Sequence, residues 1–148
     1  MGAIGLNDIL LTELQKISTK GGDVFHGMKS YDVGYEGFGE AYFSWINTGE
    51  IKAWKKHKRM TMNLIVPVGN VKFVFYGVGE TGLKEFKVEK IGNENYKRIT
   101  VPPGIVFGFQ GISAKKSLIL NIASIPHDPS EVERLMLDDI DYAWDKLP

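Results

Sequence analysis

The order of apolar and polar residues predicts many short strands. Runs rich in β-branched and aromatic residues alternate with turn residues along most of the chain. Strands are predicted at 40–46 (EAYFSWI), 60–68 (MTMNLIVPV), 71–77 (VKFVFYG), 96–101 (YKRITV) and 117–124 (SLILNIAS). Turn signals separate them at 47–49, 69–70, 92–93 and 102–104. Short strands joined by tight turns are typical of an antiparallel sandwich or barrel.

The segment between two of these runs predicts a hairpin. Gly69 and Asn70 separate 60–68 from 71–77, and either residue can adopt a positive φ in a tight turn. Pro67 lacks an N–H for strand pairing, which suits an edge strand or a bulge. We therefore expect 60–68 to pair with 71–77, in a register that Pro67 leaves open.

Helical patterns are scarce. The sequence DPSEVERLM begins with Asp128 as a helix N-cap, Pro129 fits the first turn, and Glu131 completes a capping box. This predicts a short C-terminal helix of about two turns. Residues 6–17 fit a helix and a strand equally well, because their apolar periodicity matches both.

Length, charge and cysteine content restrict the class of protein. The chain has 148 residues, which predicts one domain over 1–148. Its 18 basic residues balance 18 acidic ones, so the whole surface does not suit a polyanion. The absence of cysteine excludes disulfides and thiolate chemistry. We find no secretory leader and no apolar segment of membrane-spanning length, so a cytoplasmic protein with no membrane partner is expected.

One short stretch concentrates positive charge. IKAWKKHKRM, residues 51–60, contains five Lys or Arg side chains, one His and one Trp. It fits a nucleic-acid patch, a solvated edge strand or a pocket for an anionic substrate. In a regular strand, side chains would alternate between one face with Lys52, Trp54, Lys56 and Lys58 and another with Ala53, Lys55, His57 and Arg59.

Several blocks of the sequence carry a resemblance to a known family. In chain order they are FGEAYFSWINTGEIKAWKKHKRMTMNL, VPVGNVKFVFYG, GNENYKRITVPPGIVFGFQGI, LILNIASIPHDPSEVERL and DYAW. From about residue 29 to residue 144, the chain resembles the cupin family of dTDP-4-dehydrorhamnose 3,5-epimerase and its shorter sugar-nucleotide epimerase and isomerase relatives. Before these blocks the match is looser, and Lys20 stands where the family has an arginine.

The resemblance implies a fold and a reaction. The fold is an all-β, antiparallel jelly-roll (cupin) barrel, and the assembly is a homodimer. The reaction acts on a dTDP- or other NDP-linked 4-keto-6-deoxyhexose in deoxysugar and surface-polysaccharide biosynthesis. A base removes a proton next to the keto group, and an acid returns one to the opposite face. This chemistry needs no metal and no other cofactor.

The family pattern also implies site residues, with several departures. Lys55 occupies the position of the family's catalytic histidine, and the second histidine of that motif is retained as His57. The family's later histidine is replaced by Phe107. Its acidic tyrosine aligns near Leu120, and its enolate-holding lysine aligns near Met62 or Asn63.

We therefore predict a site in which Lys55 or His57 is the base. The predicted substrate-binding residues are Lys52 and Arg59 for the diphosphate, Tyr76 and Phe107 as ring walls, and Asn63 and Asn121 for hydroxyl or keto oxygens. No metal site is expected, because the histidines are only His26, His57 and His127.

Two functional classes remain open. The first is a sugar-nucleotide 3,5-epimerase or isomerase that works without a metal. The second is a non-catalytic cupin that binds a sugar nucleotide or scaffolds a partner enzyme after losing the family histidine. Nucleic-acid binding is not expected, because the basic stretch is short and its only aromatic residue is Trp54.

Overall fold

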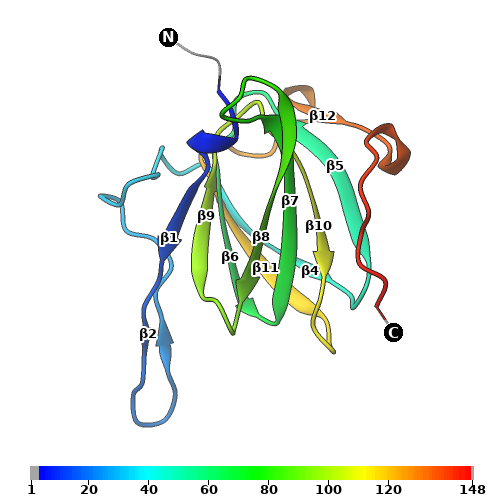
Figure 1. Cartoon of the computed structure of the whole chain (residues 1–148). Coiled ribbons are helices and arrows are strands. Elements are labelled where there is room, and N and C mark those ends of the chain that lie inside the picture. Colours follow the sequence, from blue (N-terminus) through cyan, green and yellow to red (C-terminus); the bar gives the residue numbers. More distant parts are fainter. Residues whose placement is uncertain (1–3, 148) are drawn as a thin grey trace.

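Two five-stranded antiparallel sheets pack face to face in the computed structural model, which describes residues 4–147 (Figure 1). The first sheet has the order β1-β9-β6-β11-β4, and the second has the order β12-β5-β10-β7-β8. A small third sheet pairs β2 with β3. The predicted all-β, cupin-like jelly roll is therefore confirmed. In the described part of the chain, its strands form two separate main sheets rather than one closed ring.

The elements follow one another closely along the chain. They are η1 Leu6–Asp8, β1 Leu10–Glu13, β2 Lys16–Ile17, β3 Val24–Phe25, β4 Glu40–Ile46, β5 Ile51–His57, β6 Met62–Val68, β7 Asn70–Val78, β8 Lys84–Gly92, β9 Lys97–Val101, β10 Val106–Gly111, β11 Ser117–Ala123, η2 Pro129–Glu131, β12 Val132–Arg134 and η3 Leu137–Asp139. The five runs predicted as strands correspond to β4, β6, β7, β9 and β11. The ambiguous segment 6–17 begins with a 3-10 turn and continues as strand.

The predicted hairpin between β6 and β7 is wrong. Strand β6 pairs with β9 and β11, whereas β7 pairs with β8 and β10 in the other sheet. Gly69, with φ of 84°, turns the chain from one sheet to the other, as the positive-φ prediction requires. A Cβ there would come within 2.1 Å of the Ser117 hydroxyl oxygen, so only glycine fits. The positive φ predicted at the turn is confirmed, but a turn does not determine which strand becomes the partner.

The predicted C-terminal helix is also wrong beyond its first turn. Asp128 does cap the segment, because its carboxylate accepts a 2.9 Å hydrogen bond from the Ser130 N–H. A 3-10 turn follows over Pro129–Glu131, and the chain then becomes strand β12 beside β5. Glu131 does not complete a capping box, because its side chain is buried in contacts with the end of β5. Pairing with β5 takes the place of further helical turns.

The core lies between the two main sheets. It contains Phe73, Phe75, Ile46, Ile91 and Ile99, all at most 1% exposed. Each such side chain contributes roughly 1.5–3 kcal/mol when removed from water. Strand β4 follows the expected alternation: Tyr42, Ser44 and Ile46 face inward, while Phe43 and Trp45 face outward. The inner faces therefore hold the fold together and leave room for the polar groups described below.

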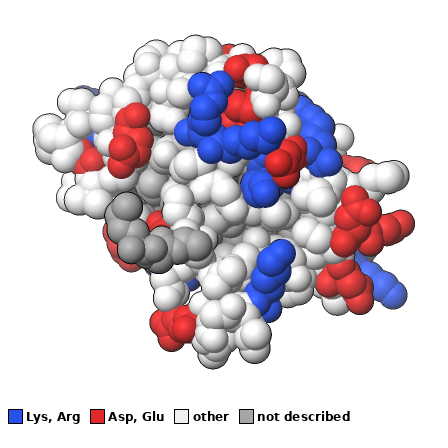
Figure 2. Space-filling model, turned by 90° about the horizontal axis from the view of Figure 1, so that it is seen from above, with Lys and Arg blue, Asp and Glu red and all other residues white. Residues whose placement is uncertain are grey.

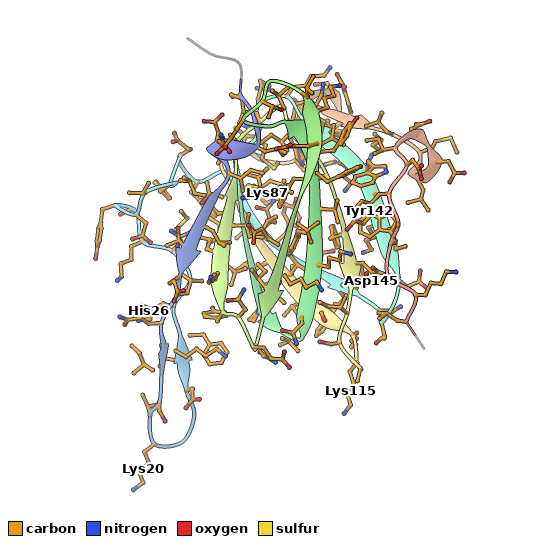
Figure 3. The ribbon with its side chains drawn as sticks, viewed as in Figure 1. Lys20, His26, Lys87, Lys115, Tyr142 and Asp145 are labelled. Carbon is orange, nitrogen blue, oxygen red and sulfur yellow. The ribbon has the colours of Figure 1, made fainter. Side chains whose placement is uncertain are left out.

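Two terminal segments flank the sandwich. The β2–β3 hairpin extends away from it, with Lys20 at its tip (Figure 3). The C-terminal segment 135–147 covers Trp54, whose ring lies 5.3 Å from Trp144 and 6.4 Å from Tyr142 between centroids. Asp145 anchors this segment through a 3.0 Å ion pair with Lys72 of β7. Within residues 4–147, no helix is long and apolar enough to span a membrane.

Candidate active site

Strand β5 contains a bulge that changes which side chains share a face. Phe107 of β10 lies opposite Lys55, and the next residue, Gly108, lies opposite Ala53, so Trp54 has no partner on that side. Trp54 instead exchanges backbone hydrogen bonds with Leu135, at 3.0 and 3.3 Å. One extra residue reverses the alternation. As a result, Lys52 and Lys55 line the same hollow, although a regular strand would point them to opposite sides.

The hollow has an outer and an inner part. The outer part, of about 350 Å³, includes Lys52, Lys55 and Arg134 among its walls. The inner part, of about 60 Å³, lies between the two main sheets and includes His57, Tyr42 and Asn121. The two parts share four lining residues, Ser44, Lys55, Phe107 and Phe109, and therefore adjoin one another; together they are called the cavity below. A ligand with a bulky charged portion and a small neutral end would fit such a shape.

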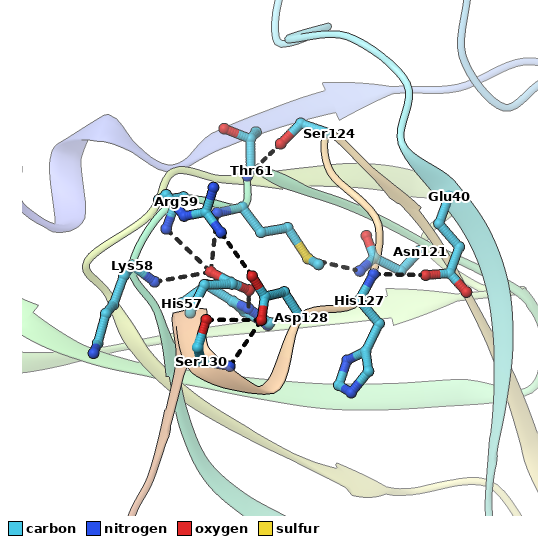
Figure 4. Close-up of polar contacts among 12 residues, drawn as sticks. Glu40, His57, Lys58, Arg59, Thr61, Asn121, Ser124, His127, Asp128 and Ser130 are labelled. Carbon is cyan, nitrogen blue, oxygen red and sulfur yellow. Dashed lines mark hydrogen bonds and ion pairs between the residues drawn. The ribbon is translucent and has the colours of Figure 1, made fainter.

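A buried hydrogen bond fixes the histidine of the inner cavity. Nδ1 of His57 lies 2.5 Å from Oε1 of Glu131, and the two residues are only 7% and 2% exposed. The other carboxylate oxygen, Oε2, accepts hydrogen bonds from the backbone N–H groups of Lys58, Arg59 and Met60 at 3.1–3.3 Å (Figure 4). Burial alone would raise the pKa of Glu131. The hydrogen bonds from His57 and the backbone outweigh that effect and hold the pKa below its ordinary value.

This arrangement determines the tautomer of His57. An ionised carboxylate only accepts hydrogen bonds, so Nδ1 carries a proton and donates it to Glu131. Nε2 is then left with a free lone pair that can accept a proton. The imidazole also stacks on Phe107, with ring centroids 6.1 Å apart and planes 18° apart. His57 is therefore held in one orientation on the wall of the cavity.

Lys55 sits among other cations at the junction of the two parts. Burial is the main cause that lowers the pKa of Lys55, and the positive charges of Arg134 and Lys52 lower it further. Among residues 4–147, no carboxylate forms an ion pair with Lys55. Three cations thus converge on one hollow, and none of them forms an ion pair with a carboxylate in the described part of the chain, which is an arrangement suited to an anion.

The opposite wall of the inner cavity supplies neutral polar groups. Tyr42 and Ser44 come from β4, and Asn121 comes from β11. Nδ2 of Asn121 donates a 3.0 Å hydrogen bond to the Tyr42 hydroxyl oxygen. The charged groups on β5 therefore face a phenol, a hydroxyl and an amide across the space between the sheets.

Three predicted substrate residues lie elsewhere. Arg59 is on the surface, where its guanidinium lies 2.9 Å from the Asp128 carboxylate (Figure 4). Tyr76 lies on the outer face of the second sheet and packs against Phe86, with centroids 4.8 Å apart. Asn63 is buried behind the cavity wall and bonds to Gly34 O and Thr100 Oγ1. The predictions of direct substrate contact by Arg59, Tyr76 and Asn63 are not supported by this geometry.

The other predicted residues do meet in the cavity. Lys52, Lys55, His57, Phe107 and Asn121 all line one of its two parts. Lys52 reaches it because of the Trp54 bulge, and its ammonium group also donates a 2.9 Å hydrogen bond to Trp45 O. Seen from above the sandwich, Lys and Arg side chains lie beside Asp and Glu side chains rather than forming a continuous basic face (Figure 2).

The sequence patterns did not indicate two residues of the cavity, Tyr42 and Arg134, or the carboxylate that holds His57, Glu131. Tyr42 had a usable signal, because it alternates with Ser44 and Ile46 on one face of a predicted strand. Glu131 also had a signal, but it was interpreted as a capping box. Arg134 had none, since its position depends on β12 pairing with β5.

A metal cluster and another hollow were considered as alternative sites within residues 4–147. No group of three or more His, Asp or Glu side chains among residues 4–147 is arranged to hold a metal ion. A hollow of about 410 Å³ lies beside β1 and residues 26–32. Its buried cation, Arg98, already contacts Gly27 O at 2.7 Å and Asp32 at 3.4 Å. The prediction of no metal stays a prediction.

Comparison with solved structures places this architecture among known proteins. A dTDP sugar isomerase from Desulfovibrio desulfuricans G20 superimposes with a TM-score of 0.84 and 31% sequence identity, over 93% of this chain and 90% of that one. The chain belongs to the dTDP-sugar isomerase and epimerase family. No protein-family model matches the sequence of this family member.

Two further relatives share a lower sequence identity with this chain. The dTDP-4-dehydrorhamnose 3,5-epimerase of Sulfolobus tokodaii has a TM-score of 0.78 at 19% identity, over 95% of this chain and 84% of that one, and at that identity the likeness concerns the fold. The spore coat polysaccharide biosynthesis protein SpsL of Bacillus subtilis (strain 168) is 25% identical over 115 residues, which is 74% of this chain and 76% of that protein. The family predicted from the sequence blocks is thus confirmed.

Proposed function

We propose that this protein epimerises or isomerises a dTDP-linked 4-keto-6-deoxyhexose by moving protons next to the keto group. The observation that carries the proposal is the His57–Glu131 pair on the wall of the cavity. A histidine whose Nδ1 is held by a buried carboxylate is a general base of the kind that proton abstraction requires. The names of the relatives, a dTDP sugar isomerase and a 3,5-epimerase, support a sugar nucleotide as substrate.

In the proposed reaction, His57 is the base and Lys55 stabilises the enolate. Nε2 of His57 takes the proton from the carbon beside the keto group, and the C–H electron pair forms the enolate double bond. The negative charge moves to the former keto oxygen. Lys55 is on the same face of β5 as His57 and lines both parts of the cavity, so its ammonium group can approach that oxygen. A positive charge preorganised at a developing oxyanion lowers the barrier directly.

The outer part of the cavity suits the diphosphate. Lys52 and Arg134 line it together with Lys55, and charge-assisted hydrogen bonds to phosphate are among the stronger polar contacts. We assign Arg134 the role that the sequence suggested for Arg59, because Arg59 is turned away toward Asp128. The sugar then extends from the outer part into the inner part, toward His57.

The proposal includes an assembly and a setting. On the outer face of the first sheet, Phe43 and Trp45 of β4 are 64% and 46% exposed, and Val68 of β6 is 44% exposed. Such an apolar face on a terminal strand supports a homodimer. If it is the dimer interface, Phe43→Glu should sediment as a monomer in analytical ultracentrifugation. The likeness to SpsL supports a role in polysaccharide biosynthesis, and a cytoplasmic location is part of the same proposal.

Deuterium exchange tests the activity directly. The protein is mixed with dTDP-4-keto-6-deoxyglucose in deuterated buffer, and NMR follows carbons 3 and 5. Deuterium at either carbon supports an epimerase or isomerase. Binding of dTDP by calorimetry without any exchange would favour the second candidate, a non-catalytic cupin that binds a sugar nucleotide. The specific observation behind that candidate is Lys55, which stands where the family pattern has its catalytic histidine.

A further inference from the structure

Strand β5 is regular toward one neighbouring strand and irregular toward the other. On the β12 side, Arg134 lies opposite Lys55. The next residue, Leu135, donates to and accepts from the backbone of Trp54, at 3.0 and 3.3 Å, so the pairing continues without a break. On the β10 side, the pairing passes directly from Lys55 to Ala53 and leaves Trp54 out. The backbone of the bulge is therefore held from the β12 side alone.

The C-terminal segment 135–147 also holds the side chain of Trp54. The indole Nε1–H donates a 3.2 Å hydrogen bond to Leu137 O, and the residue is only 1% exposed. The rings of Tyr142 and Trp144 pack on the indole, with centroids 6.4 and 5.3 Å away. Past its first residue, and as far as residue 147, the segment lines neither part of the cavity. Its contact with the site thus passes through Trp54.

Buried polar groups of the second sheet anchor the end of this segment (Figure 3). Gln110 of β10 donates from Nε2 to Asp145 O at 2.8 Å and accepts the Asp145 N–H at 3.2 Å. Lys72 of β7 lies 3.0 Å from the Asp145 carboxylate and 5.0 Å from the ring centroid of Tyr142. Burial alone would lower the pKa of Lys72, but its contacts with Tyr142 and Asp145 outweigh that effect and raise the pKa. A charged Lys72 therefore keeps the segment in place over Trp54.

Without these contacts, β5 would be free to pair regularly with β10. If Lys55 kept its partner, Trp54 would lie opposite Gly108, and each earlier residue would shift by one position. Lys52 would then change face and leave the cavity. The present bulge also needs a glycine across from it, because a Cβ at Gly108 would lie 2.6 Å from the Ala53 Cβ. The two registers therefore differ in whether Lys52 reaches the outer part of the cavity.

We propose that Trp54 is a positioning residue for nucleotide binding: held by the C-terminal segment, it keeps β5 in the bulged register that brings Lys52 to the outer part of the cavity. This inference rests on the proposed function, which assigns Lys52 to the diphosphate. Only the bulged register presents Lys52, Lys55 and Arg134 together, so the apparent affinity for dTDP depends on the fraction of molecules in that register. The C-terminal segment thus controls the affinity of a cavity from which it is mostly absent.

A double-mutant cycle with Lys52 tests this role, using isothermal titration calorimetry with dTDP. Trp54→Ala should weaken binding about tenfold, and Trp144→Ala, which removes one ring packed on Trp54, about threefold, as the bulged register becomes less populated. In the Lys52→Ala background both registers present the same cations, so either substitution should change the affinity by less than about twofold. If the indole instead contacted the ligand directly, its loss would be equally large in both backgrounds. Urea denaturation of each variant establishes that binding is measured on folded protein.

The control is Tyr76→Ala, which removes a ring that packs on Phe86 and does not line the cavity; its dTDP affinity should stay within about twofold of the wild type. Equal losses for Trp54→Ala with and without Lys52 would overturn the inference and leave the proposed function standing. Variants that are less stable in urea but bind dTDP as tightly as the wild type would do the same. If Trp54→Ala does not fold, an unchanged affinity in Trp144→Ala overturns the inference. Wild-type protein that binds no dTDP would overturn the inference, and the absence of deuterium exchange as well would overturn the proposed function.

Discussion

The basic stretch 51–60 supplies two sets of side chains that end in different surroundings. Lys52, Lys55 and His57 line the cavity. Lys55 is partly buried there, and His57 is buried. Lys56 and Arg59 lie at the surface in ion pairs with Glu133 and Asp128, at 3.3 and 2.9 Å. Surface pairs of this kind contribute little to stability. The face of the strand on which each charged side chain lies therefore indicates its role better than the density of charge along the sequence does.

The largest expected effect is on the buried pair. In Glu131→Gln, the backbone N–H groups that now contact Oε2 require the amide oxygen on their side. The amide NH₂ then faces Nδ1 of His57, which must become an acceptor, and the proton moves to Nε2. Because Nε2 then has no free lone pair, we expect the deuterium exchange rate to fall by about 10³-fold, within the range for loss of a general base.

A matched control for Glu131 lies two residues further along the chain, in β12. Glu133→Gln removes a carboxylate that contacts only the surface Lys56 among the ion pairs described, so exchange should stay within about twofold. If Glu131→Gln exchanges as fast as Glu133→Gln, His57 is not a base held by Glu131. Circular dichroism of both variants should accompany the NMR assay.

The next effect concerns the charge of Lys55. Because its pKa is lowered from 10.5, the ammonium form should disappear as the pH rises through a value below 10.5. If that charge stabilises the enolate, the exchange rate should fall with it. Lys55→Met should be slower by about 10²-fold at neutral pH and should lack this alkaline fall. Lys55→Arg should keep the charge to higher pH, so its alkaline fall should move upward.

The lowered pKa of Lys55 also predicts how the free energy of unfolding changes with pH. Between the lowered pKa of the folded protein and 10.5, the unfolded chain binds more protons at Lys55 than the folded chain. The free energy of unfolding should therefore rise with pH across that interval, relative to Lys55→Met. Urea denaturation of both proteins at several pH values measures the difference. A difference that falls with increasing pH would contradict the assigned burial of Lys55.

A smaller effect is expected on nucleotide affinity. Lys52→Ala should weaken dTDP binding by roughly 10- to 100-fold, because each charge-assisted contact to phosphate contributes about 1.5–3 kcal/mol. Arg134→Ala should have a similar effect. Lys56→Ala and Lys58→Ala should change the affinity by no more than about twofold, since exposed charges are screened. Isothermal titration calorimetry with dTDP decides this, and equal small losses in all four variants would mean that the outer hollow is not a phosphate site.

The smallest effect should come from Arg59. Its guanidinium is 61% exposed and pairs with Asp128, which is itself 41% exposed. Arg59→Ala should lower the free energy of unfolding by less than about 1 kcal/mol and leave dTDP affinity unchanged within about twofold. A tenfold loss of affinity would restore the original assignment of Arg59 to the diphosphate and weaken the case for Arg134.

Much of the fold was predictable because strand patterns are local. The runs that became β4, β6, β7, β9 and β11 each carry their own apolar periodicity and turn residues. Pairing was less predictable: nothing near Gly69 shows that β6 and β7 belong to different sheets. Strand β8 was missed because it is a polar edge strand with few buried residues. Its recognition requires its neighbour β7.

Some residues of the candidate site could likewise be predicted from the sequence, and others could not. Lys55, His57 and Phe107 could be located because the family blocks fix their place in the chain and the structure brings them together. Glu131 was identified as a helix cap because its local sequence fits one. Only the approach of η2 to the end of β5 reveals its contact with His57. The positions of Arg59 and Arg134 also depend on distant contacts, because Arg59 pairs with Asp128 at the surface and Arg134 reaches the cavity only through the pairing of β12 with β5.

The unpaired Trp54 changes the interval at which side chains of β5 share a face. Across it, side chains three residues apart share a face, as Lys52 and Lys55 do, whereas beyond it the interval returns to two, as for Lys55 and His57. A motif written with a fixed interval of two would match Lys52 with Trp54 and leave Lys55 out. Deleting a paired residue such as Ala53 would do more harm than replacing it, because the side chains before it would change face, whereas deleting the unpaired Trp54 would leave the register of the others as it is. The length of this strand is thus as much a part of its chemistry as its residues are.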